Sequence, residues 1–221
     1  MAASATTAAG HRTPRRADVD LISSAQPTPE SPADVDEASD FSRVQARLAK
    51  ADASATSSAL CDGCTGDATT LQVLYLKHTR EGTFDNVATA WSSCTECGAT
   101  ALSVQVVVLP KAHTVNARNR ALATNDTCEG CATAAAAYQL VVVGADEKVL
   151  SRQSRRQLQE LVDQLAAELH ATGAAPGAQQ RRGAAPDLEA QAQTGIAELE
   201  SLLRAELGAV TIERDVQLKT G

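Results

Sequence analysis

Residues 92–110 read SSCTECGATALSVQVVVLP and place Cys94 and Cys97 directly before a run of Val and Leu. The same arrangement occurs three times, and the first cysteines of successive copies are 33 and then 34 residues apart. Aligned on their cysteines, the copies read CDGCTGDATTLQVLYL, CTECGATALSVQVVVL and CEGCATAAAAYQLVVV. Every cysteine of the chain belongs to one of these pairs: Cys61/Cys64, Cys94/Cys97 and Cys128/Cys131. The sequence therefore predicts a three-unit repeat.

The repeat has two further invariant columns, which give the pattern C-x2-C-x3-A-x3-Q followed by four apolar residues. The alanine column is Ala68, Ala101 and Ala135, and the glutamine column is Gln72, Gln105 and Gln139. A side-chain amide that recurs within an apolar strand can hydrogen-bond to the next copy and form a ladder that fixes the register. The alternative is a column of glutamines that faces solvent. Both interpretations are architectural.

The apolar blocks of the repeat favour strands over helices. They are rich in Val and Leu, and two of them end at Pro110 or Gly144. A helix is the alternative, because Cys61, Cys64 and Ala68 also fall on one helical stripe. We expect an α+β fold: a β-rich three-unit repeat, solenoid-like or a small sheet, followed by C-terminal helices and preceded by a disordered tail.

The regions before and within the repeat differ sharply in composition. Residues 1–40 hold four of the seven prolines and an excess of acidic residues, which predicts a disordered acidic tail. Residues 41–50 are compatible with a short helix that leads into the repeat, and the repeat domain is expected over 41–147.

The region after the repeat is expected to be helical. An amphipathic helix is predicted over 148–172, with Ser154 and Gln157 as a capping box. A Pro/Gly/Ala linker is predicted over 173–187, and a second helix within 188–221, ending near Gly208. The alternation in the last residues is compatible with a strand.

The second helix carries an apolar stripe with two interpretations. One is packing on the chain's own body, and the other is self-association. The candidate oligomerisation residues are Ile196, Leu199, Leu203 and Leu207.

Composition excludes several classes of protein. A net charge of −7 and 2% aromatic residues do not fit a nucleic-acid-binding protein, which needs a basic face and stacking platforms. No apolar stretch is long enough for a transmembrane helix. The first residues also lack the apolar core of a secretory signal. The expected location is the cytoplasm by default, with leaderless export as the alternative if the cysteines are oxidised.

Four kinds of chemistry fit the cysteine pairs. A disulfide within each pair would explain why each unit has two cysteines, and would stabilise the fold by about 2 kcal/mol per bridge. Zinc could be held by two pairs together, or by one pair completed by His78 or His113. Thiol–disulfide catalysis would require a helix after each pair. The last interpretation is small buried thiols without further chemistry.

The unit CTECGATALSVQVVVL resembles Cys-pair repeats of predicted bacterial proteins, some of which are described as peptide zinc metalloproteases. The resemblance covers roughly residues 51–145 and includes the cysteine, alanine and glutamine columns. It implies a bacterial repeat protein. A zinc protease would need the motif HExxH, and this chain has four isolated histidines, His11, His78, His113 and His170, so no catalytic role is carried over.

The sequence thus predicts a non-enzymatic repeat module, used for assembly or for binding a protein partner, with no cofactor. A zinc-binding domain and a thiol–disulfide redox protein are the alternatives. No phosphate-binding glycine loop and no nucleophile motif occurs in the chain.

Overall fold

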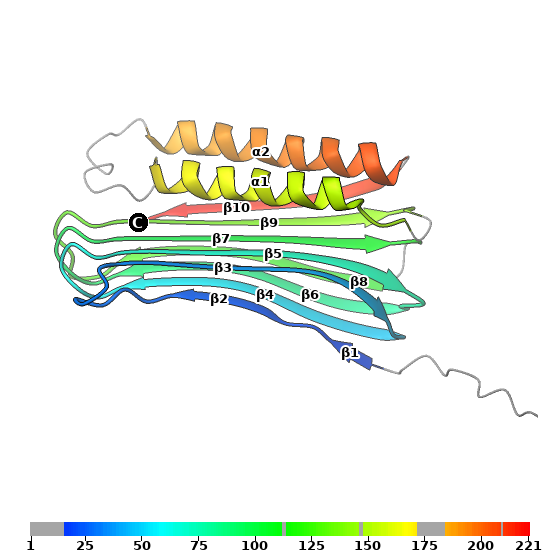
Figure 1. Ribbon diagram of the computed structural model, residues 1–221, viewed down its shortest axis with the longest axis horizontal. Helices are drawn as coiled ribbons and strands as arrows, with labels where there is room; N and C mark the ends of the chain where they lie inside the picture. Colours follow the sequence, from blue (N-terminus) through cyan, green and yellow to red (C-terminus); the bar gives the residue numbers. More distant parts are fainter. Residues whose placement is uncertain (1–15, 112–113, 146–147, 172–183, 209) are drawn as a thin grey trace, which may run out of the picture.

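The computed structural model describes residues 16–111, 114–145, 148–171, 184–208 and 210–221. Its body is a flattened β-solenoid in which the chain alternates between two facing parallel sheets (Figure 1). Two helices follow and pack on one of these sheets. The predicted α+β architecture, a β-rich repeat followed by helices, is confirmed.

Two sheets of long strands form the solenoid, and they differ in what lies outside them. We call the first the open sheet: β1 (Arg16–Asp18), β2 (Leu21–Ala25), β4 (Leu48–Ala59), β6 (Glu81–Ser92) and β8 (Thr114–Asn125). We call the second the covered sheet: β3 (Ala33–Gln45), β5 (Thr65–Lys77), β7 (Gly98–Leu109), β9 (Ala132–Val143) and β10 (Thr211–Thr220).

Each turn of the solenoid lies in register on the one before it. In the covered sheet Gln72 pairs with Gln105 and Gln105 with Gln139, all in parallel strands. In the open sheet Ala88 pairs with Ala121 in the same way. The repeat of the sequence is therefore the turn of the solenoid, and equivalent residues form columns along it.

The central strands of the covered sheet, β5, β7 and β9, are buried on both faces, which explains the continuous apolar blocks of the repeat. All twelve residues of β7 are buried. One face of the sheet packs against the open sheet, and the other packs against the helices. Strands of parallel sheets that are covered on both faces have this composition.

The open sheet instead alternates along each strand. In β4 the alanines at every second position point into the solenoid, and Lys50, Asp52 and Ser54 between them lie on the outside. The interior between the two sheets is built largely of alanine and other small residues, so the sheets approach closely without aromatic side chains. Phe84 is the one large aromatic residue among the described interior positions.

Helices α1 (Arg152–Leu169) and α2 (Ala184–Leu207) run side by side over the outer face of the covered sheet (Figure 1). The N-cap of α1 is Ser151, whose hydroxyl accepts a hydrogen bond from the Ser154 N–H. The predicted capping box at Ser154 and Gln157 is therefore wrong by one turn, because the helix begins at Arg152. Gly208 ends α2 with a φ of 89°, as expected of a C-cap glycine.

The apolar stripe of α2 lies against the body of its own chain. The side chains of the predicted oligomerisation residues are at most 1% exposed and belong to the core between the helices and the covered sheet: Ile196, Leu199, Leu203 and Leu207. Their assignment to an interface between copies is wrong, because the covered sheet offers an apolar surface within the same chain. The predicted linker over 173–187 lies outside the described residues up to 183, and α2 already begins at Ala184.

Residues 16–45 form a complete turn before the first cysteine pair, so the predicted disorder over 1–40 is wrong from residue 16 onward. Residues 1–15 lie outside the described part of the chain. The parallel pairing of β2 with β4 and of β3 with β5 makes this segment an additional turn without cysteines. The predicted helix at 41–50 is likewise wrong, because β3 and β4 occupy it. Three of the four prolines that indicated disorder, Pro27, Pro29 and Pro32, lie in the connection of this turn.

Strand β10 closes the far end of the covered sheet. It returns from α2 and pairs with β9 in the antiparallel direction, from Thr211 opposite Val143 to Thr220 opposite Ala134. The strand expected in the last residues is therefore present. Among the described residues, no helix has both the length and the apolar character needed to cross a membrane.

Candidate functional site: the cysteine column

Each cysteine pair lies in the connection that carries the chain from the open sheet to the covered sheet. The third residue of each CxxC motif has a positive φ: 69° at Gly63, 53° at Glu96 and 71° at Gly130. In the first connection the Cys64 N–H donates to the Cys61 carbonyl over 3.0 Å, which closes a four-residue turn. The spacing of two residues between the cysteines thus matches one tight turn.

The connections stack on one another through their backbones. The Gly63 N–H donates to the Thr95 carbonyl over 2.9 Å, and the Glu96 N–H donates to the Glu129 carbonyl over 2.7 Å. The six cysteines therefore form a column along one end of the solenoid.

In the structure each cysteine pair is closed as a disulfide within its own turn: Cys61–Cys64, Cys94–Cys97 and Cys128–Cys131. The first cysteine of each pair is partly exposed, and the second is buried. Every pair therefore has one partly exposed and one buried cysteine.

The sulfurs of the second and third pairs also contact each other across turns. The Cys97 Sγ lies 3.0 Å from the Cys131 Sγ and 3.8 Å from the Cys128 Sγ. The sulfurs of Cys94, Cys97 and Cys131 all lie within 4.8 Å of one another, which is close enough for one metal ion to contact all three. The spacing of the turns thus brings thiol positions from different pairs together.

The first pair has different neighbours. Its sulfurs lie near backbone carbonyls of the preceding turn, with the Cys61 Sγ 3.7 Å from the Pro27 oxygen and the Cys64 Sγ 3.9 Å from the Thr28 oxygen. That turn has no cysteine, and the backbones of Thr28 and Ser31 bond to each other there instead.

Neither of the histidines in the described residues, His78 and His170, completes a cysteine site. His78 follows β5, whereas Cys64 precedes it, so the 13 residues of that strand separate the two by about 40 Å. The mixed site with His78 is therefore wrong, and His11 and His113 lie outside the described residues. His170 hydrogen-bonds to Asp67 on β5 over 2.9 Å, and this bond raises the pKa of its imidazole.

The three glutamines lie in the interior and form a continuous ladder. The Gln105 amide donates to the Gln72 side-chain oxygen over 2.8 Å, and the Gln139 amide donates to that of Gln105 over 2.7 Å. At the N-terminal end, the Gln72 amide donates to the Val19 carbonyl over 3.0 Å. The alanine column lies in the same interior, at Ala68, Ala101 and Ala135.

The interior also contains a second polar column, of asparagines, which was not predicted from the sequence. The buried Asn86 amide donates to the Asn119 side-chain oxygen over 2.8 Å and to the Tyr138 carbonyl over 3.0 Å. Asn119 in turn donates to the Asp215 carbonyl of β10 over 2.9 Å. The two asparagines are 33 residues apart, the period of the cysteines, and that spacing is the signal that could have found them.

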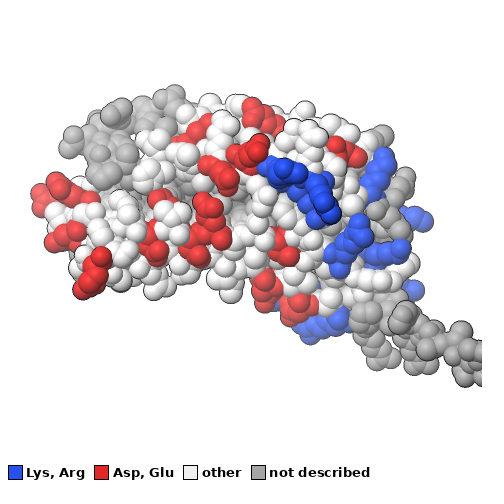
Figure 2. All heavy atoms as spheres, in the orientation of Figure 1, with Lys and Arg blue, Asp and Glu red and all other residues white. Residues whose placement is uncertain are grey.

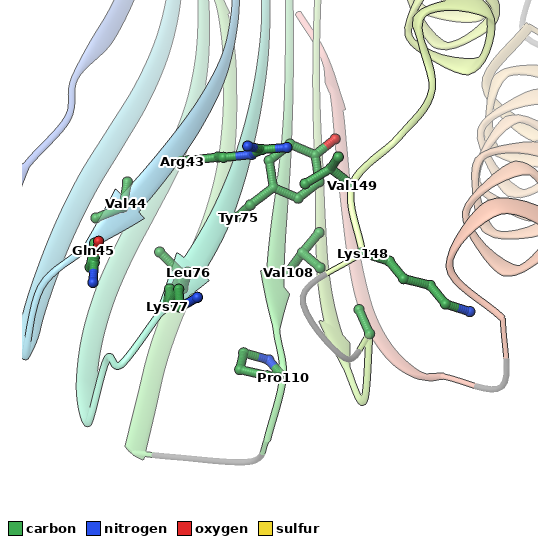
Figure 3. A pocket seen from close by; sticks show the side chains of 11 residues that line it. Arg43, Val44, Gln45, Tyr75, Leu76, Lys77, Val108, Pro110, Lys148 and Val149 are labelled. Atoms are coloured by element: carbon green, nitrogen blue, oxygen red, sulfur yellow. The ribbon is translucent and has the colours of Figure 1, made fainter.

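A pocket of about 370 Å³ lies at the opposite end of the solenoid, where β3, β5 and β7 end (Figure 3). In Figure 3 the Arg43 side chain extends toward Tyr75 and Val149. The Tyr75 hydroxyl accepts a hydrogen bond from the Leu150 N–H over 3.2 Å, and burial raises the pKa of this phenol. The lining includes three cationic side chains, Arg43, Lys77 and Lys148, and no carboxylate.

The two ends of the solenoid carry opposite charge (Figure 2). The described connections between the two sheets at the cysteine end contain only acidic charged residues: Glu30, Asp62, Glu96, Asp126 and Glu129. The strand ends and described connections at the pocket end carry mostly basic ones, among them Arg47, Lys77, Arg80, Lys111 and Lys148.

Comparison with family models, with curated proteins and with solved structures finds no match.

Proposed function

We propose that the chain is a non-enzymatic structural module whose turns are held by local disulfides. The observation that carries this proposal is the position of the cysteines, each pair spanning one tight connection between the two sheets. A bridge over four residues removes conformations from the unfolded chain and contributes about 2 kcal/mol. Three such bridges compensate for an interior of alanines, which bury little apolar area per residue.

The module associates with a second copy of itself through the free edge of the open sheet. The outer face of the covered sheet is occupied by α1 and α2, and its far edge by β10. Strand β8 pairs with β6 on one side, and no described strand pairs with its other side. Unpaired strand edges readily pair with another chain.

Charge complementarity supports an end-to-end contact. The β8 edge exposes Arg118 and Arg120. In the first turn, at the opposite edge of the open sheet, Asp18 of β1 and Asp20 before β2 are exposed. Two copies arranged head to tail would bring these opposite charges together, whereas two β8 edges placed against each other would repel.

Sedimentation velocity at low ionic strength tests this association. Wild-type protein should sediment faster as its concentration rises, and Arg118→Glu with Arg120→Glu should sediment as a monomer. The matched control changes two exposed arginines of α1 and alters net charge equally: Arg152→Glu with Arg156→Glu. The control should associate like wild type. A wild-type monomer at all concentrations, or equal loss in both variants, would refute the association.

Zinc binding by the reduced protein is the second candidate function. It is favoured by the sulfur cluster of Cys94, Cys97 and Cys131, with Cys128 as the fourth thiolate, because its sulfur lies 3.8 Å from that of Cys97. Four thiolates are a common structural zinc site, which the metal would hold in tetrahedral geometry. The first pair takes no part, since its neighbours are carbonyls.

Titration of fully reduced protein with Co²⁺, whose thiolate complexes absorb visible light, tests this candidate. One ion should bind per chain, and Zn²⁺ should displace it. Cys128→Ser with Cys131→Ser should abolish the absorption, whereas Cys61→Ser with Cys64→Ser should leave it intact. An absence of thiolate absorption in wild type, or its loss in both variants, would remove zinc as a function.

A further inference from the structure

The sulfurs of the second and third cysteine pairs, Cys94–Cys97 and Cys128–Cys131, are arranged for a reaction between disulfides. The Cys97 Sγ and the Cys131 Sγ, 3.0 Å apart, are the buried members of their two pairs. Their strands pair directly after them, at Gly98 and Ala132, and the Ala132 N–H donates to the Cys97 carbonyl over 3.0 Å. Adjacent positions of neighbouring strands have the Cα separation that a disulfide requires.

We propose that these two turns exchange disulfides, so that mild reduction converts two bridges within turns into one bridge between turns, Cys97–Cys131. This inference rests on the proposed function, since it requires the local disulfides as its starting state. The substrate is a small dithiol or a protein dithiol.

The reaction begins at the partly exposed Cys128. A thiolate of the dithiol attacks the Cys128 Sγ, which breaks the Cys128–Cys131 bond and releases Cys131 as a thiolate. The Cys131 thiolate attacks the neighbouring Cys97 Sγ. The Cys97–Cys131 bond forms, the Cys94–Cys97 bond breaks, and Cys94 leaves as a thiolate.

The second thiol of the dithiol completes the reaction. It attacks the dithiol's own sulfur in the mixed disulfide with Cys128. The dithiol thereby becomes a disulfide, and Cys128 leaves as a thiolate. Two electrons have then passed from the dithiol to the protein. The product has one buried bridge between turns and two free thiols, Cys94 and Cys128, at the partly exposed positions.

The first cysteine pair, Cys61–Cys64, supplies an internal control, because its sulfurs do not have this neighbour. Cys64 is buried like Cys97 and Cys131, but the acceptor nearest to its sulfur is the Thr28 carbonyl oxygen. Reduction of Cys61–Cys64 should therefore give two free thiols and no new bridge.

Disulfide mapping of variants that each lack one cysteine tests the exchange without any reductant. In Cys94→Ser, the unpaired Cys97 should attack Cys131, and mass spectrometry after alkylation should find Cys97–Cys131 with Cys128 alkylated. In the control Cys61→Ser, Cys64 should be alkylated and both other pairs should stay local. The reciprocal variant Cys128→Ser should also give Cys97–Cys131, now with Cys94 alkylated, and serves if Cys94→Ser does not fold.

The outcomes separate this inference from the proposed function. A Cys94→Ser or Cys128→Ser protein that is folded by circular dichroism and retains its remaining local pair would overturn the exchange alone. A wild-type protein without local disulfides would overturn the proposed function. Wild-type protein treated with one equivalent of dithiothreitol should yield Cys97–Cys131 as its main new bridge, and alkylation of Cys94 and Cys97 in equal amounts would again count against exchange.

Discussion

At the residue scale, the connection around the second cysteine pair contains a local conflict. The first and third pairs have glycine at the position of positive φ, Gly63 and Gly130, but the second has Glu96 with a φ of 53°. A residue with a Cβ is destabilised in this left-handed region of the backbone, whereas glycine is not. The turn spanned by the Cys94–Cys97 disulfide therefore holds Glu96 in a backbone conformation that a residue with a Cβ disfavours.

Glu96→Gly should stabilise the protein by about 1 kcal/mol, because it removes the strain at this position. The measurement is the midpoint of chemical unfolding under non-reducing conditions. The control is Glu129→Gly, which changes an acidic residue in the third connection at a position that has no positive φ. If Glu96→Gly stabilises no more than the control does, positive φ is not the source of the effect.

The glutamine ladder makes the second prediction at this scale. Gln105 is fully buried and bonds to both neighbours, so Gln105→Ala should leave the Gln72 oxygen without this donor and the Gln139 amide with only the Phe84 carbonyl as acceptor. We expect a loss of about 3 kcal/mol in the free energy of unfolding. Gln153→Ala, at an exposed position of α1, should change it by less than about 0.5 kcal/mol. A loss below 1 kcal/mol at Gln105 would mean that the ladder contributes little to stability.

At the scale of elements, polar contacts as well as apolar faces hold the helices to each other and to the solenoid. At one end the Ser151 N–H donates to Glu206 of α2 over 3.2 Å, which lowers the pKa of that carboxyl group. At the other end His170, directly after α1, bonds to Asp67 of β5, and the hydroxyl of Thr100 donates to the same carboxylate. Both ends of α1 are thus fixed to other elements.

The contact between His170 and Asp67 should make stability depend on pH. The folded state raises the pKa of His170, so its contribution is complete below the unfolded value of 6.5 and is lost as the pH rises through the folded value. Both side chains are partly exposed, and the contribution should therefore be below about 1 kcal/mol.

Thermal unfolding of His170→Gln from pH 5 to pH 8.5 measures this contribution. The variant should melt below wild type at pH 5, and the difference should shrink toward pH 8.5. The control is His78→Asn, which removes an imidazole from an exposed connection. A deficit of His170→Gln that grows with pH would reverse the sign and refute the explanation.

At the scale of the whole molecule, the sequence revealed the repeat because equivalent columns stack in a parallel solenoid. The cysteine, alanine and glutamine columns occupy interior or corner positions, and the same residue fills each of them in three successive turns. The first turn was missed because prolines replace the cysteines in its connection, and because β3 is an edge strand with many acidic residues. Composition alone indicated disorder there, and pairing with β5 overrides it.

The sequence also did not determine what the apolar stripe of α2 packs against. Its apolar stripe fits a partner chain as well as the same chain, and only the covered sheet, apolar on its outer face, decides between them. The contact between Cys97 and Cys131 also depends on the register of neighbouring turns, which the spacing of the cysteines suggests but does not determine.

The most direct test of the central claim is a disulfide map of the native protein, purified without reductant and alkylated before digestion. The claim that each pair closes its own turn predicts three bridges, Cys61–Cys64, Cys94–Cys97 and Cys128–Cys131, with no alkylated cysteine. Reduction should then lower the midpoint of thermal unfolding, because the local bridges contribute about 2 kcal/mol each. Six alkylated cysteines, or bound zinc in the intact native mass, would contradict the claim.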